Sequence, residues 1–209
     1  LGVYVSGHPL EPYEEEWRKV ISATTADFQV DPEVGYTKVR DGAREIIGGI
    51  IAEKTVKHTK TNQMMAFLTV EDLFGTVEVV VFPRDYEKYR QYLEEDNKIF
   101  VKGRVSEEDD KASKLICEKI LPFGQKKKEL WIQFPDKETY LEEEAITYGY
   151  LADSEGNDEV MIYCEKEKIV KKLPANKNIS INPQILSRLM NHFGENRVKV
   201  VEKAIENHF

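Results

Sequence analysis

Carboxylates are the commonest groups in this sequence that could do chemistry, and two of their runs are Glu107–Asp110 and Glu142–Glu144. Paired carboxylates can hold two metal ions for phosphoryl transfer, or exchange protons as acid and base. Here one run falls in a predicted turn and the other in a predicted helix, so we interpret both as solvated surface. The sequence also lacks a phosphate-binding glycine loop, paired zinc-ligand spacing and a nucleophile elbow. It therefore predicts a binding module with no catalytic residue, no metal ligand and no cofactor of its own.

The remaining reactive side chains have structural explanations. Asp72 follows a strand in the run Asp72–Gly75, where it is expected to cap a turn. His8 has no second ligand nearby and is expected to be structural. Cys117 and Cys164 match no metal motif and make no disulfide framework, which indicates reduced thiols and a cytoplasmic protein. No apolar run approaches the length of a membrane span, and no signal-peptide pattern is present.

A different chemistry is available where basic residues lie beside an aromatic residue. Ammonium groups attract phosphates, and an aromatic ring offers a face on which a base can stack. The candidate residues for such binding are Lys54, Lys57, His58, Lys60, Phe67, Lys102 and Arg104. We expect Lys54, Lys57 and Lys60 at the rim of the face that carries Phe67. Lys102 and Arg104 are second choices, on the outer side of a later strand that also carries Phe100.

The elements that must position these residues lie between Glu45 and Pro122. Strands are predicted at 45–58, 65–72, 76–82, 98–106 and 112–121, with a helix at 83–93 whose Tyr86, Tyr89 and Leu93 plug one end. Period-2 alternation places one set of side chains inside: Ala66, Leu68, Val70, Val77, Val79, Val81 and Val101. Five strands with a helix between the third and fourth are typical of the OB-fold barrel, a fold that binds nucleic acids.

The flanking segments have a different rhythm. Residues 1–44 are expected to form a short helical segment, at 11–21, followed by a linker. Residues 123–209 are expected to form a small α+β domain. Within that domain we expect strands at 129–134, 160–164, 168–173, 179–181 and 197–201. Helices are expected from a cap at Asp136 to about 151 and at 183–193, where Gly194 ends the second one. The predicted fold is thus an all-β OB-fold five-stranded barrel, 45–122, between a helical N-terminal segment and an α+β C-terminal domain.

Composition limits how the chain could contact nucleic acid. Its 209 residues are 41% hydrophobic and 33% charged, and the formal net charge is −8. A chain this acidic can attract phosphates only through a local basic patch. Because the sequence starts with Leu1 rather than methionine, we expect it to be part of a longer protein.

Several motifs resemble the C-terminal part of the bacterial replicative DNA polymerase III alpha subunit. They are Leu1–Leu10, Gly48–Ile51, Met65–Asp72, Glu78–Pro83, Tyr86–Tyr89 and, more distantly, 173–201. The resemblance implies a replicase that extends primers with deoxynucleotides and magnesium, its catalytic carboxylates lying upstream of this chain. It implies a barrel that contacts single-stranded template DNA and a terminal domain that docks the clamp-loader tau subunit. The sliding-clamp-binding peptide of that family lies upstream, and this chain has no match to it.

The second and third strands also resemble the anticodon-binding barrel of class II aminoacyl-tRNA synthetases. That resemblance implies a base stacked on Phe67 and a base edge read at Glu78, where the family usually has glutamine. Three hypotheses follow: a single-stranded-DNA-binding module of a replicase, a protein-interaction module with the barrel as a spacer, and the anticodon arm of a synthetase.

Overall fold

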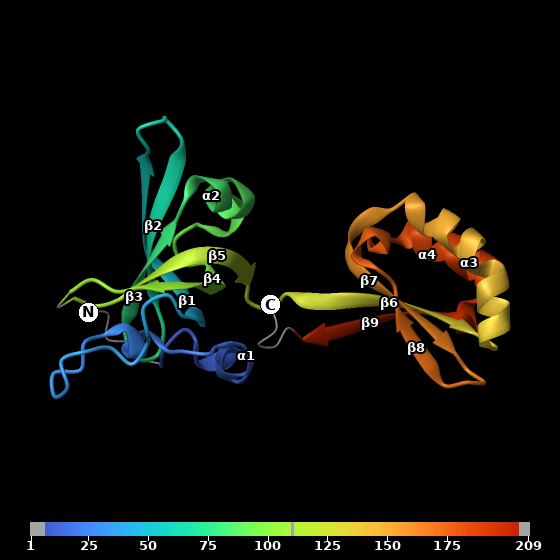
Figure 1. The fold of residues 1–209 in the computed structure, drawn as a ribbon, viewed down its shortest axis with the longest axis horizontal. Coiled ribbons are helices and arrows are strands. Elements are labelled where there is room, and N and C mark those ends of the chain that lie inside the picture. Colours follow the sequence, from blue (N-terminus) through green and yellow to red (C-terminus); the bar gives the residue numbers. More distant parts are fainter. Residues whose placement is uncertain (1–6, 110, 205–209) are drawn as a thin grey trace. The chain divides into compact units, whose positions relative to one another are not determined.

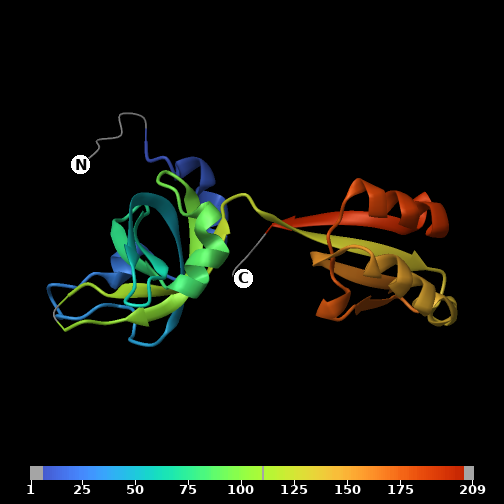
Figure 2. The ribbon, with the colours of Figure 1, turned by 90° about the horizontal axis from the view of Figure 1, so that it is seen from above.

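The alternating apolar residues in the middle of the chain form a closed five-stranded barrel. The computed structural model describes residues 7–109 and 111–204. The barrel elements are β1 Arg44–His58, β2 Met64–Glu71, β3 Thr76–Val81, α2 Pro83–Tyr89, β4 Lys98–Ser106 and β5 Lys114–Pro122. The strands pair in the order β1-β2-β3-β5-β4 and close (Figure 1), and α2 lies alongside them (Figure 2). The predicted OB-fold barrel is confirmed.

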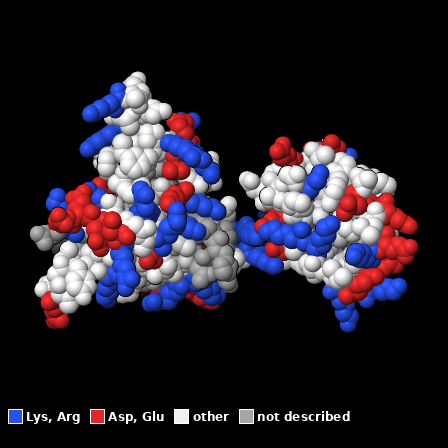
Figure 3. Space-filling view, in the orientation of Figure 1, with Lys and Arg blue, Asp and Glu red and all other residues white. Residues whose placement is uncertain are grey.

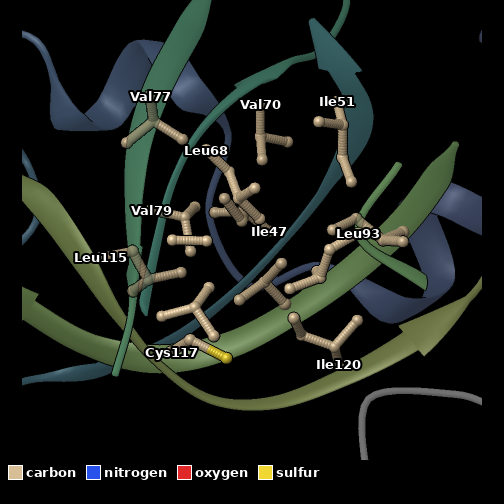
Figure 4. Packing of buried hydrophobic residues seen from close by; sticks show 14 of the residues in the cluster. Ile47, Ile51, Leu68, Val70, Val77, Val79, Leu93, Leu115, Cys117 and Ile120 are labelled. Carbon is tan, nitrogen blue, oxygen red and sulfur yellow. The ribbon is translucent and has the colours of Figure 1, made fainter. Parts of the chain in front are cut away.

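The residues predicted to point inward fill the barrel. Each of the seven is buried: Ala66, Leu68, Val70, Val77, Val79, Val81 and Val101. Several of them meet Ile47, Ile51, Leu115 and Ile120 from the neighbouring strands in one apolar cluster (Figure 4). Tyr86, Tyr89 and Leu93 join the same cluster from the helical connection, as predicted. Burial of this apolar surface is the main favourable term that holds the barrel closed.

Two glycines in β1 allow other groups to approach the strand closely. A Cβ on Gly49 would lie 2.2 Å from the backbone oxygen of Glu71, and one on Gly48 would lie 2.6 Å from the Phe100 ring. Both distances are shorter than a Cβ tolerates, so a larger residue would need the strands to move at Gly49 and the packed aromatic side chains to move at Gly48.

The N-terminal segment packs on the outside of the barrel. Helix α1, Glu14–Val20, buries Trp17, whose indole nitrogen donates a hydrogen bond to the Gly48 carbonyl at 2.7 Å. Phe100 is on the outer side of β4, as expected, but it is buried because it packs in a cluster with Trp17, Val20 and Ile46. Phe123 stacks on Phe100 with ring centroids 4.1 Å apart.

Asp72 and His8 have the structural roles expected of them. The Asp72 carboxylate accepts hydrogen bonds from the backbone of Phe74 at 2.8 Å and of Gly75 at 3.2 Å, which caps the turn. His8 Nδ1 accepts from the Leu10 backbone, and its Nε2 lies 3.2 Å from a Glu71 carboxylate oxygen.

The chain divides into two compact units, the first ending at Gln125 and the second spanning Lys126–Ala204. The second unit contains β6 Lys126–Phe134, α3 Lys137–Ala152, β7 Glu155–Cys164, β8 Ile169–Lys172, α4 Pro183–Phe193 and β9 Val198–Ala204. Its sheet has the order β8-β7-β6-β9, with β6 parallel to β7 and antiparallel to β9. Tyr140 of α3 and Phe193 of α4 both contact Phe134 of β6, so the two helices pack on the same face of the sheet.

Local signals place the ends of the two helices. Asp136 caps α3 by accepting from the Thr139 backbone at 2.8 Å, and Asn182 caps α4 by accepting from the Ile185 backbone at 3.0 Å. Gly194 follows α4 with φ +97°, a backbone angle that favours glycine. The predicted cap at Asp136 and the predicted stop at Gly194 are confirmed.

Three predicted details of the second unit are wrong. Strand β6 begins at Lys126 rather than Glu129, because its three lysines pair with β9. Strand β7 begins at Glu155, inside the predicted turn, and no strand forms at 179–181, where Ile179 makes only isolated bridges. The motif residues at 1–6, Asp110 of the acidic turn and residues 205–209 lie outside the described residues.

Candidate nucleic-acid interface

The outer face of β1, β2 and β3 carries the predicted aromatic residue. Cross-strand pairing places Thr55 opposite Phe67, and Phe67 opposite Val80. Residues that lie directly opposite in a sheet share a face, so these three form one row. A neighbouring row pairs Thr69 with Glu78. Phe67 is half-buried, which leaves part of its ring available to a ligand.

Lys57 lies over the Phe67 ring. Its Nζ is 5.0 Å from the ring centroid, within the range of a cation–π contact. An open depression of about 320 Å³ surrounds the pair and is lined by Glu53, Thr55, Lys57, Phe67, Leu68, Thr69 and Glu78. The structure therefore brings together three of the predicted site residues, Lys57, Phe67 and Glu78. It adds the hydroxyls of Thr55 and Thr69, which the sequence analysis missed. The outward position of Thr69 follows from the alternation along β2, whereas that of Thr55 depends on a β-bulge in β1.

Lys54 is not on this face, contrary to expectation. It pairs with Leu68, which points into the barrel, and its Nζ lies 3.0 Å from a Glu94 carboxylate oxygen. The cause is a β-bulge: Ile51 pairs with Val70 but the next partner of β2 is Glu53, so one residue of β1 is extra. The extra residue exchanges the inward and outward positions for the rest of the strand.

Alternation along the end of β1 separates the other basic residues. His58 pairs with Met64 and shares the side of Lys54, whereas Lys57 shares the side of Phe67. Lys60 is exposed in the hairpin loop that follows β1, which closes through a hydrogen bond from the Thr59 backbone to the Gln63 carbonyl at 2.8 Å. The predicted cluster of four basic residues is thus split between two faces and a loop.

Arg104 extends the Phe67 row across the barrel. Val80 pairs with Ile116 of β5, and Ile116 pairs with Arg104 of β4. Arg104 is exposed on the outer face, as predicted. Lys102 faces outward two residues earlier on β4, opposite Lys119.

Lys119 belongs to a basic group that the sequence analysis missed. Burial, and then the nearby Lys102 and Lys88, lower the pKa of Lys119. Sequence spacing gave no signal for this group, because its members come from α2, β4 and β5.

Acidic residues moderate the positive charge at the depression. Glu78 lies 3.7 Å from Lys114 Nζ, which also contacts Glu108 at 2.9 Å. The hydrogen bond that Lys114 donates to Glu108 is the main cause that raises the pKa of Lys114. Lys114 is therefore paired with carboxylates. The lysine that lines the depression is Lys57, over the Phe67 ring.

The fold and this face together define an OB-fold barrel whose outer face combines an aromatic ring with basic side chains. The family described as an OB-fold nucleic acid binding domain matches residues 46–123. The chain is 35% identical to a DNA polymerase III subunit alpha of Borreliella burgdorferi over 121 residues, 58% of this chain and 10% of that protein. It is 29% identical to the DNA polymerase III subunit alpha of Bacillus subtilis over 203 residues, 95% of this chain and 17% of that protein.

These relatives are much longer than the chain, which spans 10% and 17% of their lengths. Among solved structures, the chain is similar to the SSB domain of a Synechococcus protein. The identity is 14%, the TM-score is 0.35, and the match covers 39% of this chain and 96% of that one. Within residues 7–109 and 111–204, no helix has the length and apolar character needed to cross a membrane. The same residues contain no cluster of three or more histidine, cysteine or acidic side chains suited to a metal ion.

Proposed function

We propose that the barrel binds single-stranded DNA weakly, and with little sequence preference, across the outer face of β1 to β3. The observation that carries the proposal is the Lys57 ammonium 5.0 Å from the centre of the Phe67 ring, beside an open depression. Aromatic stacking with basic side chains beside it is the usual way in which OB folds bind single strands. Every base has a flat face, so stacking on one ring discriminates little among sequences.

Each residue at the face has a distinct role in this proposal. Phe67 stacks on a base, Lys57 contacts a phosphate, and the Thr55 and Thr69 hydroxyls donate hydrogen bonds to the strand. Arg104 contacts a phosphate farther along the same row. Glu78 faces a base edge, and Lys60 and Lys102 make outlying contacts. Lys54 and His58 have no role here, because they lie on the opposite side of the strand.

The expected affinity is low. At this face, one half-buried aromatic ring and few cations act against a formal net charge of −8. Stacking on one ring contributes about 1–3 kcal/mol. We therefore expect a dissociation constant on the order of micromolar or weaker at low salt.

A matched pair of lysine variants tests the site by fluorescence anisotropy with a labelled oligodeoxynucleotide. Lys57→Ala should weaken binding and reduce the slope of log affinity against log salt by about 0.7, the value for one phosphate contact on a single strand. Lys54→Ala removes the same charge three residues away on the other face and should leave binding unchanged. Phe67→Ala should weaken binding without changing the slope. Equal binding by wild type and Lys57→Ala at low salt, or a larger effect of Lys54→Ala, would place the ligand elsewhere.

We further propose that the chain acts within a replicative DNA polymerase. The name and coverage of the two curated relatives support this proposal. In that setting, the barrel would hold single-stranded template, while DNA-templated synthesis with magnesium, and the contact with the sliding clamp, belong to regions upstream of this chain. Such an assembly would work in the cytoplasm. A Phe67→Ala change placed in the complete polymerase should lower primer extension on long single-stranded templates more than on short ones.

The second unit is proposed to dock the clamp-loader tau subunit through α3. Leu141 and Ile146 on this helix are 56% and 49% exposed, and exposed apolar side chains on a helix favour protein contacts. The variant Leu141→Ser with Ile146→Ser should lose tau in a pull-down, while Ala145→Ser, at an exposed position on the same helix, should keep it. Retention of tau by the double variant would exclude α3.

The anticodon-arm hypothesis makes a different prediction. It requires the chain to bind an anticodon stem-loop much more tightly than an oligodeoxynucleotide of equal length, with Phe67→Ala weakening the former. If neither nucleic acid binds at low salt, the barrel is a spacer between protein contacts.

A further inference from the structure

The second unit has a sheet face that neither of its helices covers. The side chains that alternate toward α3 and α4 include Leu130, Ile132 and Phe134 of β6, all buried. The alternate residues of β6 therefore lie on the opposite face, and among these Trp131 and Gln133 are half-buried. We call this side the open sheet face of the second unit.

The pairing of strands β8, β7, β6 and β9 aligns four side chains in one row across the open sheet face. Trp131 pairs with Met161 on one side and with Lys199 on the other, and Met161 pairs with Lys172. The row therefore reads Lys172, Met161, Trp131, Lys199, with a lysine at each end of an apolar and aromatic centre. Tyr163 pairs with Gln133 in the adjacent row and adds a second aromatic ring.

Two nearly buried carboxylates hold this surface in place. Glu129 is 6% exposed; it accepts a hydrogen bond from the Trp131 indole nitrogen at 3.0 Å and lies 3.1 Å from Lys203 Nζ. Glu159 contacts Lys127 at 2.7 Å and also Lys172. Burial would raise the pKa of Glu159, but Lys127 and Lys172 outweigh it and lower that pKa. Each of the two carboxylates is thus in contact with at least one lysine ammonium group.

The remaining charge on the open sheet face is positive. The charged residues named on this face are the two glutamates and four lysines, Lys127, Lys172, Lys199 and Lys203. Together these six residues have a formal charge of +2. Figure 3 shows lysine and arginine side chains gathered over β6 and β9, and acidic side chains gathered over α3. The two surfaces of this unit therefore suit partners of opposite charge.

We propose that the open sheet face is a second binding platform for single-stranded nucleic acid, independent of the barrel. A base stacks on Trp131, whose ring is oriented by Glu129, and the strand runs so that its phosphates meet Lys199 and Lys172. A four-stranded sheet with helices on one face and aromatic residues on the other is a recurring architecture for stacking unpaired bases. Lysines at both ends of the row complement a backbone that enters and leaves across the strands.

Tryptophan emission tests the platform directly, because the chain contains two tryptophans and Trp17 is fully buried in the first unit. The titration uses oligothymidylate of about 15 nucleotides and the whole chain carrying Lys57→Ala and Phe67→Ala, which disables the proposed barrel site. Stacking on Trp131 should quench its emission as the oligonucleotide binds. In a further Trp131→Phe variant, which keeps an aromatic ring, the quenching should disappear while anisotropy still reports binding.

The lysines are tested in the same background. Lys172→Ala with Lys199→Ala should weaken binding at least about fivefold and lower the salt slope by about 1.4, for two phosphate contacts. Lys137→Ala with Lys166→Ala removes the same charge elsewhere in the unit and should have no such effect. Unquenched emission at saturating oligonucleotide, or equal effects of the two lysine pairs, would overturn the proposal. Quenching by polyglutamate but not by oligothymidylate would also overturn it, and would identify the face as a site for acidic protein segments.

Discussion

Asp72 joins the N-terminal segment to the barrel, and its replacement should be among the most damaging polar substitutions in the first unit. The side chain is 2% exposed. Its carboxylate accepts from the Thr25 backbone at 2.8 Å and the Thr25 hydroxyl at 2.6 Å, besides the two turn N–H groups of Phe74 and Gly75. Asp72→Ala would leave both polar groups of the fully buried Thr25 without an acceptor. Each unsatisfied buried group costs about 1–3 kcal/mol, so the free energy of unfolding should fall by about 3–5 kcal/mol.

A double-mutant cycle with Thr25→Val isolates the link between the two segments. Thr25→Val alone removes one hydrogen bond and should cost about 1 kcal/mol. The double variant should cost less than the sum of the single variants by about 1–2 kcal/mol, because the hydroxyl that Asp72→Ala leaves unsatisfied is then absent. Asp31→Ala, which removes an exposed bond to the Glu33 backbone, is the control and should cost below about 1 kcal/mol.

The measurement is urea unfolding followed by Trp17 fluorescence in a Trp131→Phe background, so that the signal reports only the first unit. Two units can unfold separately, which makes a single-unit probe necessary. A loss below about 1 kcal/mol for Asp72→Ala, or a coupling near zero, would refute the reasoning.

Three further predictions concern packing, thiol chemistry and capping. Gly49→Ala should destabilise the first unit by roughly 1–3 kcal/mol, because its Cβ would lie 2.2 Å from a β2 carbonyl oxygen. Gly149→Ala, in α3, should instead stabilise the second unit by roughly 0.5–1 kcal/mol, because the new Cβ would have no atom within 4 Å besides its chain neighbours and the nearby backbone of its own helix. Urea unfolding measures both changes, and equal signs would contradict the geometry. Burial, aided by nearby carboxylates, raises the pKa of Cys117 to about 12 and also raises the pKa of Cys164. Both thiols should therefore stay protonated near pH 8 and resist iodoacetamide until the chain is denatured, and rapid native labelling seen by mass spectrometry would disprove this. Asn182→Ala removes the α4 cap and should lower the free energy of unfolding of the second unit by about 1 kcal/mol. Asn182→Asp, which keeps a capping oxygen, should show no such loss in the same unfolding assay.

The sequence alone determined the elements whose signals are local. Alternation over β2 and β3 identified the inward residues, such as Leu68 and Val79, because side chains along a regular strand must point to opposite faces. Asp136 and Gly194 marked helix ends because a cap depends only on the residues within one turn. The order of the barrel elements followed from these local patterns.

Tertiary structure decided which of the candidate residues share a face. A single extra residue in β1 moved Lys54 away from Phe67 and placed Lys57 beside it, and no local pattern marks the position of such a bulge. Long-range packing also buried the outward Phe100. The open sheet face of the second unit has the same origin, since Trp131 meets Lys199 only through pairing of strands far apart in the chain. Spacing along a sequence fixes the period of a strand, whereas the neighbours of each side chain depend on register, which is set by the packing of the whole sheet.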